Sequence, residues 1–233
     1  MLDSKTEVIL ALDVESRAKA EKILVATGAK LKWVKIGLQT YLRDGPNFLD
    51  EVASSGKEIF LDLKLHDIPN TMVKAIESLS DLPIKMLTLH STAGPEALEK
   101  CAIAAKQFLP NTKLLAVTVL TSMNQNNLSS IGVENKIPDQ VDKLAQMAID
   151  SSIEGIVCSP LELIRLKPIL PGSTTFVTPG IRPEGSATGD QKRVMTPYQA
   201  AQAGANFLVI GRPIIAANNP ETALTEIQAE IDR

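Results

Sequence analysis

The segment IFLDLKLHDIPNT, residues 59–71, is an apolar, β-rich run that ends in three charged residues. Alternate side chains of a strand share a face, so we expect Asp62 and Lys64 to point to one side and the intervening leucines to the other. Asp67 follows just past the expected strand end, where Pro69 suits the first turn of a helix. The segment therefore predicts a strand that carries an Asp-x-Lys-x-x-Asp set of charges to its carboxyl end.

Two earlier apolar runs end near a charge in the same way. The run VILALD at residues 8–13 finishes at Asp13, and the run WVKIG at residues 33–37 carries Lys35. A single Asp-x-Lys-x-x-Asp string is more often a structural ion pair at a strand end, covered by loops. Four charges, two of each sign, on three successive runs favour a functional site instead.

Apolar, β-rich runs recur along the whole chain, at residues 8–13, 33–37, 58–64, 85–90, 113–120, 155–159, 174–179 and 207–211. Segments with helical spacing and good helix formers lie between them, at residues 16–27, 70–79, 95–108, 139–151 and 196–203. Nearly continuous apolar strands that alternate with helices are typical of parallel strands covered on both faces. Eight such units predict an α/β fold, a single-domain (β/α)8 TIM barrel over residues 1–233.

An open, doubly wound sheet is the alternative fold for this alternation. Its usual Gly-x-Gly-x-x-Gly turn after the first strand is absent, and Leu-Asp-Val stands there at residues 12–14. In a barrel, the carboxyl ends of all strands surround one mouth, where the active sites of this fold lie. The charges of the first three strands, Asp13, Lys35, Asp62 and Lys64, are therefore expected to face one cavity.

The composition is that of an ordinary globular protein, with 44% hydrophobic and 22% charged residues, which excludes extensive disorder. A net charge of -3 offers no basic field to attract nucleic acid or an anionic membrane. Any bound phosphate must therefore be held by local donors.

The two cysteines, Cys101 and Cys158, are too few for a disulfide framework, and the sequence has no Cys/His cluster for zinc. The N-terminus has no signal pattern, and no apolar run approaches the roughly 18 residues of a membrane span. We therefore expect a cytoplasmic protein without membrane contact. His66 and His90 lie far apart in the sequence, and each is expected to be a packed or hydrogen-bonded side chain rather than a ligand.

Candidate phosphate donors follow the last two strands. Residues 178–191, TPGIRPEGSATGDQ, are rich in Gly, Pro and Ser and predict a long mobile loop that closes as a lid. The eighth run ends in VIGRP at residues 209–213, where a close backbone approach and a helix start favour an anion. These two loops are the usual phosphate site of the barrel fold. The candidate donors are Arg182, Gln191, the amide of Gly211 and Arg212.

Taken together, the motifs resemble the orotidine 5'-phosphate decarboxylase family. The resemblance is carried by ALD ending at Asp13, VKIG around Lys35, FLDLKLHDIPNT at 60–71, VTVLTSM ending at Met123, TPGIRPEG from Thr178, GDQKR around Gln191 and VIGRPI around Arg212. Their order and spacing match over nearly the whole chain, which makes the resemblance far more specific than one short motif would be.

The resemblance implies an enzyme that converts orotidine 5'-phosphate to UMP in pyrimidine biosynthesis, with no metal and no other cofactor. It implies that Lys64 is the catalytic proton donor, that Asp62 lies beside the substrate carboxylate, and that Lys35 and Asp13 complete the charge array and contact the ribose. It also implies a homodimer in which Asp67, Ile68 and Thr71 reach into the partner's site. The remaining substrate-binding residues that it implies are Thr121, Pro179, Arg182, Gln191, Gly211 and Arg212.

Two other functions remain open at this point. Magnesium-dependent sugar-phosphate enzymes of the same barrel group, such as 3-hexulose-6-phosphate synthase and 3-keto-L-gulonate-6-phosphate decarboxylase, share the Asp-x-Lys-x-x-Asp motif. They hold the metal partly with a carboxylate at the end of strand two, where this chain has Lys35, so metal independence is expected. A nucleotide-binding barrel without catalysis would need the phosphate donors alone, and the presence of Asp62, Lys64 and Asp67 together argues against it.

Overall fold

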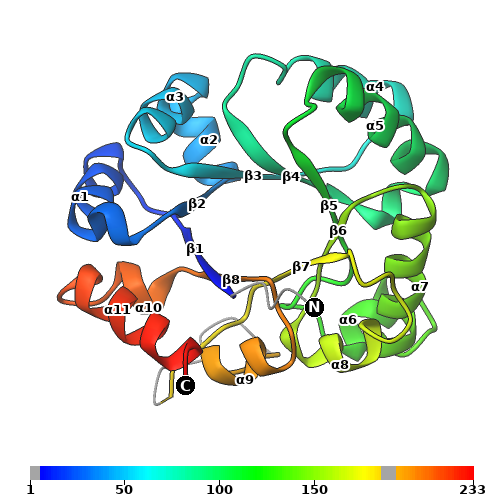
Figure 1. Cartoon of the computed structure of the whole chain (residues 1–233). Coiled ribbons are helices and arrows are strands. Elements are labelled where there is room, and N and C mark those ends of the chain that lie inside the picture. Colours follow the sequence, from blue (N-terminus) through cyan, green and yellow to red (C-terminus); the bar gives the residue numbers. More distant parts are fainter. Residues whose placement is uncertain (1–5, 185–192) are drawn as a thin grey trace.

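The computed structural model describes residues 6–184 and 193–233, so Gln191 lies outside the described residues. Eight parallel strands close into a barrel in chain order, with β8 paired to β1, and the helices form a ring around it (Figure 1). The strands are β1 (Glu7–Ala11), β2 (Trp33–Gly37), β3 (Glu58–Leu65), β4 (Ile84–His90), β5 (Lys113–Val117), β6 (Gly155–Val157), β7 (Thr175–Thr178) and β8 (Phe207–Ile210). The predicted (β/α)8 barrel is confirmed, and the open sheet is excluded because the first and last strands pair.

The helices begin where the sequence provides capping groups or proline. The α-helices are α1 (Arg17–Thr27), α2 (Leu38–Asp44), α3 (Pro46–Ser54), α4 (Pro69–Glu77), α5 (Pro95–Phe108), α6 (Gln125–Ser130), α7 (Ile137–Asp150), α8 (Leu163–Leu166), α9 (Pro197–Gln202), α10 (Arg212–Ile215) and α11 (Pro220–Ile231). Short 3-10 helices are η1 (Gly28–Lys30), η2 (Ser91–Ala93) and η3 (Pro160–Glu162). Proline stands in the first turn of α4, as the sequence predicted, and the side chains of Ser16 and Thr196 cap α1 and α9.

The strands separate two apolar cores by the alternation of their side chains. The core inside the barrel consists of Ile9, Ala11, Trp33, Phe60, Met86, Leu115, Val177 and Val209. The larger core lies between the sheet and the helices, and it contains Leu61, with Leu63 and Leu65 packed against it. The leucines of β3 therefore point outward, as predicted, and the inward positions above Phe60 are left for Asp62 and Lys64.

The β3–β4 pairing has an irregularity that the sequence pattern did not predict. Leu61 pairs with Leu87 and Leu65 with Leu89, so three residues of β3 lie opposite Thr88 alone. Within this bulge Lys64 has a φ of 50°, in the left-handed region that a non-glycine residue seldom adopts. Such strain persists only where the surroundings hold it, and it is concentrated at functional sites.

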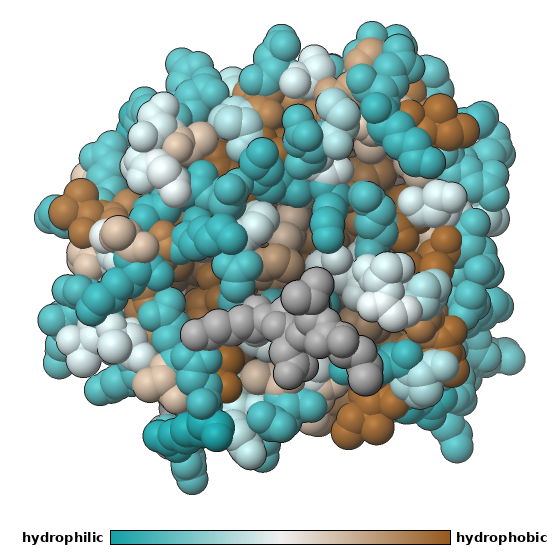
Figure 2. Space-filling model, in the orientation of Figure 1, coloured by the Kyte–Doolittle hydropathy of each residue, from teal (hydrophilic) through white to brown (hydrophobic). Residues whose placement is uncertain are grey.

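The face of the molecule seen in Figure 2 is mostly hydrophilic, with apolar residues scattered over it. The most exposed large hydrophobic side chains, Val25, Leu42, Ile103 and Ile164, belong to α1, α2, α5 and α8, which are different parts of the helical ring. Among the described helices, none is both long and apolar enough to cross a membrane.

Candidate active site

A cavity of about 620 Å³ opens at the carboxyl ends of the strands. The residues that the sequence predicted for the site and that line this cavity are Asp13, Lys35, Asp62, Lys64, Thr121, Pro179, Arg182, Gly211 and Arg212. They come from the ends of the first three strands and from the loops after β5, β7 and β8. Because the closed barrel places the carboxyl ends of its first and last strands at one mouth, it brings together residues that are about 200 positions apart in the sequence.

Four side chains of the lining form a row of alternating charge. Lys35 Nζ lies 2.9 Å from Asp13 Oδ2 and 3.3 Å from Asp62 Oδ2. Lys64 Nζ lies 2.8 Å from each oxygen of Asp62, so the Asp62 carboxylate is shared by two ammonium groups. The side chains of Lys35 and Asp62 are 9% and 11% exposed, whereas that of Lys64 is 33% exposed. Of the two lysines in this row, Lys64 is therefore the one that remains accessible from the cavity.

The alternation of sign keeps the two buried members of this row charged. Burial by itself raises the pKa of Asp62, but the ammonium groups of Lys35 and Lys64 outweigh burial and lower the pKa below its ordinary value. For Lys35, burial lowers the pKa, and the carboxylates of Asp62 and Asp13 outweigh it, so the pKa is raised. Each ion is thus stabilised by its neighbours in a place where an isolated charge would be neutralised.

The close approach of Asp13 and Lys35 depends on a glycine. A Cβ atom at Gly37 would lie 2.8 Å from both Asp13 Oδ1 and Lys35 Nζ, closer than real Cβ contacts. The loop that carries Asp13 is itself fixed, because the amide of Leu12 donates to the Lys35 carbonyl at 3.0 Å and the Thr40 hydroxyl donates to the Leu12 carbonyl at 2.7 Å. The VKIG motif therefore supplies both the cation and the space for its ion pair.

Thr88 is a site residue that the sequence reasoning missed. Its buried hydroxyl donates to Asp62 Oδ1 at 2.9 Å and accepts the amide N–H of Lys64, also at 2.9 Å. The hydroxyl thus orients the shared carboxylate and holds the strained backbone of Lys64 across the bulge. The available signal was a lone polar residue at an inward position of the run KMLTLH, two residues before His90.

Much of the remaining cavity lining is apolar. This part of the lining includes Phe60, Val117, Val119, Leu120, Val157, Cys158, Val209 and Ile215, none of which the sequence reasoning named as a site residue. Burial raises the pKa of the Cys158 thiol to about 12, so this cysteine behaves as an apolar wall. A cavity lined by both a row of charges and apolar groups suits a flat molecule that carries an anionic group at one edge.

The candidate phosphate donors lie at the β7 and β8 side of the mouth. Arg182 is 9% exposed, its Nη1 donates to the Ile181 carbonyl at 2.7 Å, and its amide donates to the Met195 carbonyl at 2.9 Å. Gly211 directly precedes α10, and the exposed Arg212 is the first residue of that helix. Residues 185–191 of the predicted loop, Gln191 among them, lie outside the described residues.

Three predicted site residues do not line the cavity of this chain. Asp67, Ile68 and Thr71 are exposed around the start of α4, and Asp67 Oδ1 accepts the amide N–H of Ile68 at 2.7 Å. The sequence prediction that they act in a neighbouring subunit stays a prediction.

The two histidines, although far apart in the sequence, lie side by side near Lys64. The ring centroids of His66 and His90 are 5.5 Å apart and their planes are tilted by 34°. Burial, followed by the charges of His66 and Lys64, lowers the pKa of His90. Across residues 6–184 and 193–233, no group of three or more His, Cys, Asp or Glu side chains is arranged to hold a metal ion.

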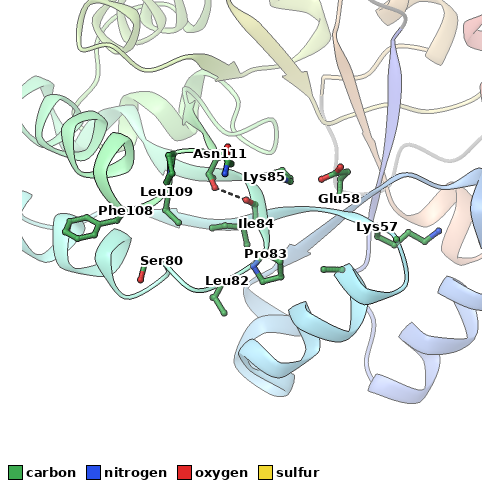
Figure 3. Close-up of a pocket in the computed structure, with 14 residues that line it drawn as sticks. Lys57, Glu58, Ser80, Leu82, Pro83, Ile84, Lys85, Phe108, Leu109 and Asn111 are labelled. Atoms are coloured by element: carbon green, nitrogen blue, oxygen red, sulfur yellow. Dashed lines mark hydrogen bonds between the residues drawn. The ribbon is translucent and has the colours of Figure 1, made fainter.

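A second cavity, of about 420 Å³, lies at the amino ends of β3–β5 (Figure 3). Lys57, one of its lining residues, is turned away, and its ammonium donates to the carbonyls of Gly28 and Leu31. The Thr112 hydroxyl donates to the Ile84 carbonyl at 2.7 Å, which ties β4 to the turn before β5. These bonds are structural, so we assign the chemistry to the cavity at the carboxyl ends.

Comparison with known proteins gives consistent matches over nearly the whole chain. The model of the orotidine 5'-phosphate decarboxylase / HUMPS family matches residues 6–227. The orotidine 5'-phosphate decarboxylase of Opitutus terrae is 49% identical over 97% of this chain and 98% of the relative, and that of Idiomarina loihiensis is 40% identical over 97% of each. The crystal structure of orotidine 5'-phosphate decarboxylase from Lactobacillus acidophilus superimposes with a TM-score of 0.85 at 33% identity, covering 98% of this chain and 100% of that chain. The resemblance inferred from the motifs is confirmed.

We expect Thr88→Val, which replaces the hydroxyl by a methyl group of similar shape, to lower the free energy of unfolding by about 1–3 kcal/mol. The reason is that the Lys64 amide and an Asp62 oxygen both lose a buried partner. Thr88→Ser keeps the hydroxyl and should lower the free energy of unfolding clearly less than Thr88→Val does. Urea denaturation followed by circular dichroism measures both values, and equal losses in the two variants would contradict the role given to the hydroxyl.

The lowered pKa of Asp62 predicts a pH dependence of stability. Its carboxylate contributes stability that is present above the unfolded pKa of about 3.9 and is lost as the pH falls through the lower folded value. From about pH 5 downward, the free energy of unfolding of the unmodified protein should therefore fall more steeply than that of Asp62→Asn. Urea denaturation at a series of pH values tests this, and parallel curves for the two proteins would refute it.

Proposed function

The chain belongs to the orotidine 5'-phosphate decarboxylase / HUMPS family, and from that premise we propose that it converts orotidine 5'-phosphate to UMP, a step of pyrimidine biosynthesis. The observation that carries the proposal is the shared Asp62 carboxylate, with Lys64 Nζ at 2.8 Å on the accessible side and Lys35 on the buried side. This row shares its cavity with apolar side chains and with Arg182 and Arg212, which suits a pyrimidine nucleotide.

The reaction poses a problem of charge stabilisation. When the bond between C6 and the carboxylate breaks, its electron pair stays on C6 in an orbital in the plane of the ring, where the π system does not delocalise it. The sequence has no pyridoxal or thiamine signature to act as an electron sink. In the proposed mechanism, preorganised charges of the protein stabilise the developing carbanion.

Lys64 is the group suited to both parts of this chemistry. Its ammonium stabilises the negative charge that develops at C6 and then transfers a proton to C6, so CO2 leaves and UMP is formed. The lysine is left as a neutral amine and regains its proton from solvent. Its accessible position in the cavity and its bulged backbone, fixed by Thr88, support this role.

The other charges keep Lys64 oriented. Asp62 holds the ammonium through two contacts of 2.8 Å and lies next to the position proposed for the substrate carboxylate. Lys35 neutralises the rest of the Asp62 charge, and Asp13, 42% exposed, lies where a ribose hydroxyl can reach it. Fixed charges of this kind need no rearrangement during the reaction.

The remaining predicted residues divide between the substrate's other end and a second subunit. We propose that Thr121 lies near the pyrimidine and that the phosphate end is held by Pro179, Arg182, Gln191, Gly211 and Arg212. We also propose a homodimer in which Asp67, Ile68 and Thr71 enter the partner's mouth, which their exposure outside their own cavity supports. Cys101 and Cys158 are buried and unpaired, which suits the cytoplasm.

We expect Lys64→Ala to abolish the decarboxylation of orotidine 5'-phosphate while UMP binding is largely retained. The reason is that, among the described residues, the other lysine that lines the cavity, Lys35, is buried behind Asp62. Loss of absorbance of the substrate measures turnover, and titration calorimetry measures UMP binding. Lys74→Ala, which removes an exposed lysine of α4, is the matched control and should keep full activity. Measurable UMP formation by Lys64→Ala would contradict the mechanism.

The magnesium-dependent relatives of the same barrel group give a separate prediction. Lys35 occupies the end of β2, where a metal-binding carboxylate would be needed, and its ammonium would repel a cation. Turnover of orotidine 5'-phosphate should therefore be unchanged in excess chelator. A loss of activity that added magnesium restores would favour the sugar-phosphate chemistry instead.

A further inference from the structure

Arg193 lies outside the lining of the cavity but is bonded to the loops that form it. One end of its guanidinium, Nη1, forms an ion pair with the Glu162 carboxylate. The other end, Nη2, donates to the carbonyls of Val119 and Leu120 at 2.9 and 3.1 Å. Both of these residues line the cavity in the loop after β5.

Glu162 is itself fixed, so the ion pair is a rigid anchor. Its side chain is 6% exposed, and its Oε2 accepts the amide N–H of Ser159 at 2.8 Å. Ser159 and Glu162 form a capping box at η3, directly after β6. Arg193 therefore joins the segment after β6 to the loop after β5, and that loop continues into Thr121.

The segment that follows Arg193 fixes the phosphate side. The amide of Arg182 donates to the Met195 carbonyl at 2.9 Å, and the amide of Met195 donates to the Gly180 carbonyl at 3.3 Å. Ile181 and Met195 form an isolated parallel β-bridge. The backbone that carries Arg182 is thus paired with a segment that starts two residues from the Arg193 anchor.

We infer that Arg193, held by Glu162, is a positioning residue that sets the loop of Thr121 and the backbone of Arg182 relative to each other. The inference rests on the proposed function, because it assigns these two loops to the pyrimidine and phosphate regions of one nucleotide. An arginine is suited to this task, since its planar fork bonds a carboxylate and two carbonyls at the same time, which the single ammonium of a lysine does not reproduce.

The inference predicts a loss that depends on the phosphate of the substrate. Binding energy from a non-reacting group raises turnover only when the group is held in register with the reacting centre. Arg193→Ala should therefore lower kcat/KM for orotidine 5'-phosphate by about 10- to 100-fold, the usual size of such misplacement effects. For orotidine, which lacks the phosphate, kcat/KM should change much less. The dissociation constant of UMP should rise by about tenfold or more, whereas that of uridine should stay within about twofold.

Two further variants keep the test valid if Arg193→Ala folds poorly because Glu162 is left buried without its partner. Glu162→Gln keeps the shape and loses the ion pair, and Arg193→Lys keeps the charge and loses the fork. Both variants should also lose more kcat/KM for orotidine 5'-phosphate than for orotidine, but the loss should be smaller than that of Arg193→Ala. Arg165→Ala, which breaks the exposed ion pairs with Asp139 and Asp142 on the outer surface, is the matched control. It should leave kcat/KM unchanged for both substrates.

The outcomes separate the inference from the function on which it rests. If kcat/KM falls by the same factor for both substrates, Arg193 is merely structural and the inference is overturned; unchanged constants overturn it as well. If the unmodified protein does not turn over orotidine 5'-phosphate, the proposed function fails. The comparison of UMP with uridine binding still decides whether Arg193 positions the phosphate side.

Discussion

The structure of the site depends on one constraint, which is that a buried carboxylate must be matched by cations on both sides. Asp62 meets this constraint with Lys35 below and Lys64 above, and it is the only member that touches both. An unpaired ion at this depth would be neutralised or would cost several kcal/mol of desolvation. The bulge of β3, the hydroxyl of Thr88 and the missing side chain at Gly37 all serve to bring these groups within ion-pair distance.

The closed barrel turns this local arrangement into a site with distinct walls. The first three strands contribute the charges, the middle strands contribute apolar side chains, and the loops after β7 and β8 contribute Arg182 and Arg212. Because β8 pairs with β1, the phosphate side lies next to the loop of Asp13 although the two are far apart in the sequence. In the proposed function, a substrate that spans the mouth therefore meets cations at its phosphate and at its reacting edge.

The parts that could be predicted from the sequence are those that follow from local periodicity. The alternation within residues 59–65 was enough to predict that Asp62 points into the barrel and the leucines point outward. The repeated strand–helix units were enough to predict the fold. The left-handed backbone of Lys64 was not predictable, because it is stabilised by a hydroxyl from another strand. The roles of Thr88 and Arg193 were not predicted for the same reason, since each residue acts through contacts with segments distant in the sequence.

The same alternation of sign explains why the members of the row act as a unit. Removing Asp62 would leave two ammonium groups facing each other, whereas removing Lys35 would leave Asp62 and Asp13 without the cation between them. Each of these two changes leaves a repulsion between like charges that the removed ion had outweighed, so its effect exceeds the value of the lost contact. The two inner members of the row, Lys35 and Asp62, thus hold each other in place, and Asp62 in turn holds the accessible ammonium of Lys64 in a fixed position. A fixed position is what the proposed mechanism requires of the group that donates a proton to the ring carbon.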